Sequence, residues 1–99
     1  MAYEVLTAME VTDPKLYGEY RKAMKPILEG FGGGFRYDFW IKETLQSEAP
    51  HPINRVFAIY FRDKDSRDAF FADPAYKLIR KKYFESSVNA RTVIAEYER

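Results

Sequence analysis

Three of the four strands that this sequence predicts carry apolar residues on both faces, and this pattern strongly limits the folds open to the chain. The predicted strands cover residues 3–11, 35–41, 55–61 and 88–97. In the third strand, Val56 and Ala58 alternate with Phe57 and Ile59, so neither face is polar. Two helices can cover only one face of a four-stranded sheet, and a face open to water should be polar. A second copy of the chain is the simplest cover for the other face, so we expect a homodimer whose sheets pack together.

The segment after the first strand predicts a long amphipathic helix. Asp13 suits the N-cap, and Pro14 suits the first helical position, where a missing N–H costs nothing. The apolar residues that follow recur at the spacing of one helix face: Leu16, Tyr17, Tyr20, Ala23, Met24, Ile27, Leu28 and Phe31. Pro26 lies inside this helix and should kink it or end it early, because proline removes a helical donor.

The remaining turns and caps complete the order of elements. The glycines at 32–34 should close the first helix and turn the chain, because they follow a helix and lack a phosphate-loop pattern. Residues 63–66 offer N-cap chemistry for a second helix, and Asp73-Pro74 should interrupt and restart that helix. The predicted order is βαββαβ, an α+β fold with a four-stranded antiparallel sheet and two helices on one face.

Composition excludes several classes of protein. The chain has 99 residues, which suits a single domain over residues 1–99, and 46% of them are hydrophobic, enough to build a core. A net charge of +1 argues against nucleic-acid or anionic-membrane partners. Without cysteine there are no disulfides, thiolate metal sites or cysteine nucleophiles. Residues 1–11 lack the basic leader of a signal peptide, and no apolar run approaches a membrane span, so we expect a cytoplasmic protein.

Four segments resemble the DUF1330 family of the dimeric α+β barrel superfamily. They are E-V-T-D-P-x-x-Y-x-x-Y at 10–20, G-G-x-F-R-Y at 32–37, N-R-V-F-A-I-Y-F at 54–61 and A-F-F-A-D-P-A-Y at 69–76. The resemblance follows the chain in order over nearly its whole length. It implies a ferredoxin-like fold, a dimer that forms an α+β barrel, and a cavity between sheet and helices or inside the joined barrel. The family is largely uncharacterised biochemically, so the resemblance implies no reaction.

The sequence also departs from the family pattern. The Arg-Gly-Gly turn that usually follows the second strand is absent after Trp40, and a longer segment containing His51 takes its place. Where the third strand of the family commonly carries a glutamate, this chain has Tyr60. Related barrel families include cofactor-independent monooxygenases, haem-degrading enzymes and lactone isomerases, but their catalytic residues do not map onto this chain.

The second strand supplies the first candidate site. Arg36, Asp38 and Trp40 are predicted to share its polar face. Arg36 could bind a carboxylate, Asp38 could act as a base and Trp40 could stack on a planar ligand. The structural alternative is that Arg36 and Asp38 pair with each other while Trp40 fills the dimer interface.

The single histidine supplies the second candidate. His51 lies between two prolines in the predicted loop 42–54, and it alone has an ordinary pKa near neutrality. The alternative is a solvent-exposed loop residue without a role. One histidine, no cysteine and scattered carboxylates show no metal-ligand spacing, so we expect no metal site and infer no cofactor.

Strand register leaves further candidates open. Tyr60, Asn89, Arg91 and Tyr97 could add polar groups to a cavity, but a register slip of one residue would reverse their faces. The basic run at 80–82 could bind an anion, but its position near a helix C-terminus explains it without a ligand.

Three hypotheses of function follow from these residues. The first is a dimeric module that binds a small apolar, aromatic or anionic metabolite. The second is a cofactor-independent monooxygenase or isomerase that uses Asp38, Trp40, His51 or Tyr60. The third is a structural or interaction dimer without a ligand. The enzyme hypothesis requires that Asp38 or His51 reach a cavity.

Overall fold

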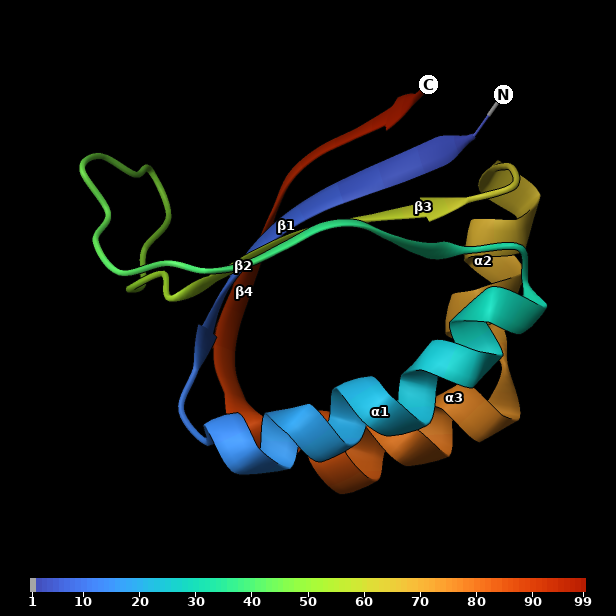
Figure 1. Cartoon of the computed structure of the whole chain (residues 1–99), viewed down its shortest axis with the longest axis horizontal. Helices are drawn as coiled ribbons and strands as arrows, with labels where there is room; N and C mark the ends of the chain where they lie inside the picture. Colours follow the sequence, from blue (N-terminus) through green and yellow to red (C-terminus); the bar gives the residue numbers. More distant parts are fainter. Residues whose placement is uncertain (1) are drawn as a thin grey trace.

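The computed structural model describes residues 2–99 and places the helices on one side of a four-stranded sheet (Figure 1). The elements in chain order are β1 (Tyr3–Val11), α1 (Pro14–Gly30), β2 (Gly34–Trp40), β3 (Arg55–Phe61), α2 (Lys64–Ala72), α3 (Pro74–Ile79), the π-helical turn η1 (Arg80–Phe84), α4 (Glu85–Ser87) and β4 (Val88–Glu98). The strand order across the sheet is β2-β3-β1-β4, and every neighbouring pair is antiparallel. The predicted βαββαβ order is therefore confirmed.

Local capping chemistry sets where the helices begin. The side chain of Asp13 accepts a hydrogen bond from the backbone N–H of Leu16 at 3.1 Å, and Pro14 opens α1. Contrary to one of the predicted outcomes, α1 does not end at Pro26 but continues to Gly30. Pro26 is exposed, so water can satisfy the helix carbonyl that loses its donor.

The predicted interruption of the second helix is also confirmed. Asp63 caps α2 by accepting from the N–H of Ser66 at 2.7 Å, and Asp73 caps α3 by accepting from the N–H of Tyr76 at 3.0 Å. The chain then passes through η1 and α4 into β4. None of the helices among residues 2–99 is long and apolar enough to cross a membrane.

The core lies between the sheet and the helices. Its buried strand residues include Val5, Met9 and Phe61, which pack against a helical set comprising Tyr17, Tyr20, Met24, Leu28, Phe70 and Tyr76. The glycine turn brings α1 close to this layer. Gly32 has a φ of +73°, and a Cβ on Gly33 would lie 2.7 Å from the carbonyl oxygen of Tyr60. Glycine is required at both positions.

The other face of the sheet, here called the outer face, carries exposed apolar side chains. Tyr37, Phe39 and Ile94 expose 52%, 50% and 55% of their surface. The irregular segment 41–54 lies at one end of the sheet and is anchored by Asn54. The Asn54 side chain accepts from the N–H of Val11 and donates to its carbonyl oxygen, both at 2.8 Å.

A register shift in β2 overturns one prediction. The pairing of β2 with β3 skips a residue between Phe35 and Tyr37, which is the pattern of a β-bulge. Asp38 and Trp40 therefore point toward the helices, whereas Arg36 lies on the outer face beside Glu4. Arg36, Asp38 and Trp40 do not share one face, because the strict alternation that the prediction assumed stops at the bulge.

Candidate functional site

A cavity of about 230 Å³ lies between the inner face of the sheet and the helices. Strands β1, β3 and β4 form one wall, and α1, α2, α3 and η1 contribute to the other. Most of the lining is apolar and includes Met9, Phe57, Phe70 and Phe84. The polar and charged side chains in the lining are Thr7, Tyr20, Arg67, Tyr76, Arg80, Arg91 and Glu96. An apolar cavity with a few polar groups is the usual form of a small-molecule site.

Two tyrosine hydroxyls meet at this cavity. The Oη atoms of Tyr20 and Tyr76 lie 2.8 Å apart, and both residues are buried. Burial raises the pKa of Tyr20 well above 10.0, and burial also raises the pKa of Tyr76. Both hydroxyls are therefore protonated at neutral pH.

Local structure explains how the tyrosines meet. Tyr20 lies on the apolar stripe of α1, and Tyr76 lies in the first turn of α3, directly after the Asp73 cap. Aromatic rings surround the pair. The ring centroid of Phe70 is 4.2 Å from that of Tyr76, and the centroid of Phe84 is 5.0 Å from that of Tyr20. These contacts hold both phenol rings in place.

The charged groups of the lining leave a positive excess. Arg67 pairs with Glu96 at 2.6 Å and so links α2 to β4. Arg80 and Arg91 form no ion pair with any residue in the range 2–99. The side chain of Arg80 instead lies over the ring of Phe84, 5.5 Å from its centroid. The cavity therefore has two arginines free to attract an anionic group.

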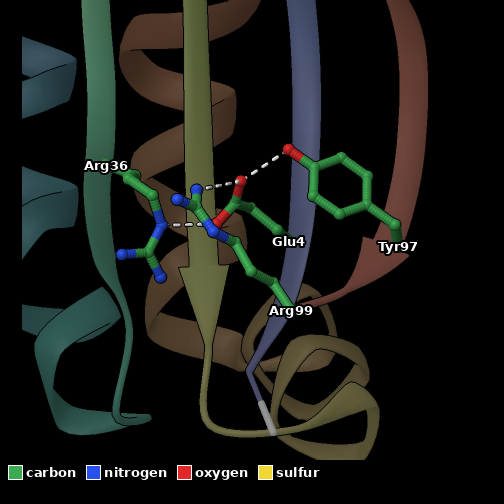
Figure 2. A network of polar contacts seen from close by, with 4 residues as sticks. All are labelled: Glu4, Arg36, Tyr97 and Arg99. Carbon is green, nitrogen blue, oxygen red and sulfur yellow. Dashed lines mark hydrogen bonds and ion pairs between the residues drawn. The ribbon is translucent and has the colours of Figure 1, made fainter.

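A second polar cluster lies on the outer face, around Glu4. Its side chain is completely shielded from solvent, although it stands on the face without helices. Arg36 Nε donates to Glu4 Oε1 at 2.5 Å, and Tyr97 Oη and Arg99 Nη1 approach Glu4 Oε2 at 2.5 and 3.4 Å (Figure 2). The guanidinium of Arg36 also lies 4.6 Å from the ring centroid of Tyr60.

The Glu4 cluster is electrostatically satisfied. Burial alone would raise the pKa of Glu4, but the hydrogen bonds from Tyr97 and Arg36 and the nearby positive charges outweigh it and lower the pKa. Arg36, Tyr60 and Tyr97 thus surround a carboxylate of the protein itself. None of these three residues lines the inner cavity.

Asp38 and Trp40 belong to a third cluster, at the edge of the sheet beside α1. Asp38 accepts from Arg21 Nε at 2.6 Å and from Arg55 Nε at 2.8 Å. The guanidinium of Arg55 lies over both the Trp40 and the Tyr17 ring, 4.3 and 5.0 Å from their centroids, and the two rings contact each other edge to face. The predicted alternative that Arg36 and Asp38 pair with each other is wrong, because each has a different partner across the bulge.

His51 ties the 41–54 segment to β4. Its Nδ1 lies 2.7 Å from the carbonyl oxygen of Pro52 and must donate to it, since a carbonyl can only accept. Its Nε2 lies 2.8 Å from Thr92 Oγ1. Beneath the same segment, a more open cavity of about 670 Å³ is lined by residues that include Leu45, Thr92 and Ile94. Neither His51 nor Asp38 lines either cavity, so the enzyme hypothesis built on them loses its support.

The structure thus separates the residues that were predicted from sequence. Arg91 lines the inner cavity, while Asn89 donates from the exposed side of β4 to Glu10 at 2.8 Å. Sequence reasoning missed Tyr20 and Tyr76, because helix packing fully explained their spacing. It considered anion binding for the basic run that contains Arg80 but favoured helix-end charge as the explanation. One signal was available: the DUF1330-like segments at 10–20 and 69–76 end on the two tyrosines that meet.

Solved structures support the fold. A protein of unknown function from Rhodopseudomonas palustris superposes with a TM-score of 0.80 at 16% identity, covering 99% of this chain and 82% of that one. A dimeric ferredoxin-like protein of unknown function from Jannaschia sp. CCS1 has a TM-score of 0.58 at 18% identity, with 100% of both chains covered. A candidate antibiotic biosynthesis monooxygenase from Bacteroides thetaiotaomicron has a TM-score of 0.60 at 18% identity, covering 98% and 89%.

These likenesses establish the ferredoxin-like α+β fold and nothing about activity, since all three identities are low. A search of curated proteins gives no significant match. The family model described as a domain of unknown function, DUF1330, matches residues 1–97. Because this match covers almost the entire sequence, the chain belongs to the DUF1330 family.

Proposed function

We propose that this chain binds a small organic anion with an apolar or aromatic body in the cavity between the sheet and the helices. The observation that carries the proposal is the combination of an aromatic lining with Arg80 and Arg91, which have no acidic partner among residues 2–99. A buried aromatic wall favours an apolar body, and two free guanidinium groups favour an anionic group on it.

We also propose that the binding unit is a homodimer joined through the outer face. Tyr37, Phe39 and Ile94 leave half or more of their surface exposed there, and burying such side chains against a second copy is favourable. A structural neighbour with the same fold is described as dimeric. A single chain supplies the whole inner cavity, so binding and dimerisation can be tested separately.

Binding, and not turnover, is the function that this geometry supports. One neighbour is described as a candidate monooxygenase. Asp38 and His51, which would have served as proton-transfer groups, lie outside the cavity. Tyr20 and Tyr76 stay protonated at neutral pH and offer no general base there.

Calorimetric titration with benzoate and its neutral isostere benzamide tests the binding proposal. We expect the wild-type protein to bind benzoate more tightly than benzamide, and Arg80→Gln or Arg91→Gln to weaken benzoate binding about tenfold. Lys81→Gln is the matched control, because it removes an exposed positive charge of η1 that does not line the cavity. Equal affinities for the two probes, or an equal loss in Lys81→Gln, would overturn the proposal. If benzoate binds as expected, mass spectrometry of molecules that copurify with the protein can identify the natural ligand.

A further inference from the structure

The hydroxyl pair of Tyr20 and Tyr76 has two O–H groups, and only one of them donates within the pair. Each hydroxyl carries one proton and can accept further hydrogen bonds. When one tyrosine donates to the other across 2.8 Å, the proton of the acceptor remains available. Neither hydroxyl has another hydrogen-bond partner among residues 2–99. A buried donor without an acceptor is costly, so the pair is well suited to a ligand that supplies one.

The protonation of the pair makes it a donor toward the ligand. Burial disfavours ionisation of both phenols, so neither gives up its proton easily. The hydrogen bond within the pair polarises the remaining O–H, and a bond to an ionised acceptor is about twice as strong as one to a neutral acceptor. The pair therefore favours an acceptor that carries negative charge.

The surroundings of the pair indicate what kind of group carries that charge. Phe70 and Phe84 pack against the two phenol rings, which favours a flat aromatic or conjugated body. The pair has one available O–H and can donate to one oxygen of the ligand. This number matches a phenolate or an enolate, whereas a carboxylate has a second oxygen that the pair cannot bind. The charge of Arg80 acts on both tyrosines, so an anionic oxygen bound at the pair is also near a positive charge.

We propose that the Tyr20–Tyr76 pair is the recognition point for a single charged oxygen on a planar ligand, so that the cavity takes phenolates or enolates. This inference rests on the proposed function and narrows its ligand class. The pair donates one hydrogen bond to the oxyanion, while Arg80 supplies the countercharge. Because no bond is made or broken, the role of the tyrosines is binding.

The probe for this inference is 4-nitrophenol, whose visible absorbance reports whether it is ionised. Preferential binding of the phenolate should lower the apparent pKa of the bound probe. The double variant Tyr20→Phe/Tyr76→Phe keeps both rings and removes both hydroxyls, and we expect it to weaken phenolate binding about tenfold to a hundredfold. It should bind 4-nitrotoluene, a neutral molecule of the same shape, as well as the wild type does.

Controls separate this inference from the proposed function. Tyr17→Phe removes a hydroxyl from another buried tyrosine of α1 that does not line the cavity, and it should leave both affinities unchanged. Near-ultraviolet circular dichroism checks that the double variant is folded. If Arg80→Gln weakens phenolate binding and the double variant does not, the tyrosine inference is wrong while the proposed function stands. If the wild-type protein binds benzoate but not 4-nitrophenolate, the tyrosine inference is also wrong while the proposed function stands. If it binds neither benzoate nor 4-nitrophenolate, both are wrong.

Discussion

Tyr97 donates a 2.5 Å hydrogen bond to Glu4, a carboxylate that is completely shielded from solvent although no helix covers it. Arg36 reaches the same carboxylate from β2 by passing across β3 (Figure 2). Its guanidinium also lies over the ring of Tyr60 of β3, so the cluster connects all four strands. Charge-assisted hydrogen bonds of this length are the stronger kind. The cluster joins the four strands at the end of the sheet where β1 begins and β4 ends.

Replacing the carboxylate should destabilise the fold measurably. We expect Glu4→Gln to lower the free energy of unfolding at neutral pH by about 1–3 kcal/mol, because its charged hydrogen bonds are lost while the site stays buried. Urea unfolding measures the change. Glu43→Gln is the control, since Glu43 is exposed and forms no ion pair among residues 2–99. A loss of the same size in the control would contradict a special role for Glu4.

The stability that Glu4 contributes to the fold should depend on pH, and its lowered pKa gives the direction. The pKa of Glu4 is lower in the folded protein than its ordinary value of 4.5, so the unfolded chain binds more protons in the window between them. The Glu4 carboxylate therefore stabilises the fold fully above pH 4.5, and this stabilisation is lost as the pH falls through the pKa that Glu4 has in the folded protein. The stability difference between wild type and Glu4→Gln should therefore shrink in acid, and a constant difference would contradict the assignment.

Removing Arg55 should disturb the cluster beside α1, and the fluorescence of the single tryptophan, Trp40, should detect the change. Arg55→Met removes the guanidinium that lies over the rings of Trp40 and Tyr17 and leaves Asp38 with Arg21 alone. We expect a changed Trp40 emission spectrum and a loss of about 2–3 kcal/mol of stability. Arg62→Met is the matched control at an exposed position without an ion pair among residues 2–99, and it should change neither quantity.

Charge on the outer face should prevent association of two copies. Sedimentation velocity should find the wild-type protein dimeric at micromolar concentration and Phe39→Glu monomeric, because a buried unpaired carboxylate is costly. Leu78→Glu is the control, since Leu78 is exposed on α3 and so on the helix side of the molecule. A stable wild-type monomer, or dissociation caused by Leu78→Glu, would show that the outer face is not the interface.

Asn54 should contribute more to the stability of the fold than Asn89, although both asparagines lie near strand ends and form side-chain hydrogen bonds. Asn54 satisfies both backbone groups of Val11, whereas Asn89 makes one exposed bond to Glu10. We expect Asn54→Ala to cost about 1–3 kcal/mol and Asn89→Ala less than about 0.5 kcal/mol in thermal unfolding. Similar costs for the two variants would contradict this assignment.

Local chemistry determined most of the architecture. The caps at Asp13, Asp63 and Asp73 and the turn at Gly32–Gly34 depend on residues within a few positions of one another, so the sequence alone could place them. The two-sided apolar strands likewise follow from side-chain alternation, which has a period of two. These local rules predicted the βαββαβ order, which the structure confirms.

Only the tertiary structure decided which polar side chains meet. The bulge at Arg36 arises from the pairing of β2 with β3, and it sends Arg36 to Glu4 and Asp38 to Arg21 and Arg55. Tyr20 and Tyr76 are 56 residues apart and meet because two helices pack over the same sheet. Sequence periodicity predicts a face within one element, but register and helix packing depend on the partner element, and so the candidate site could not be read from the chain alone.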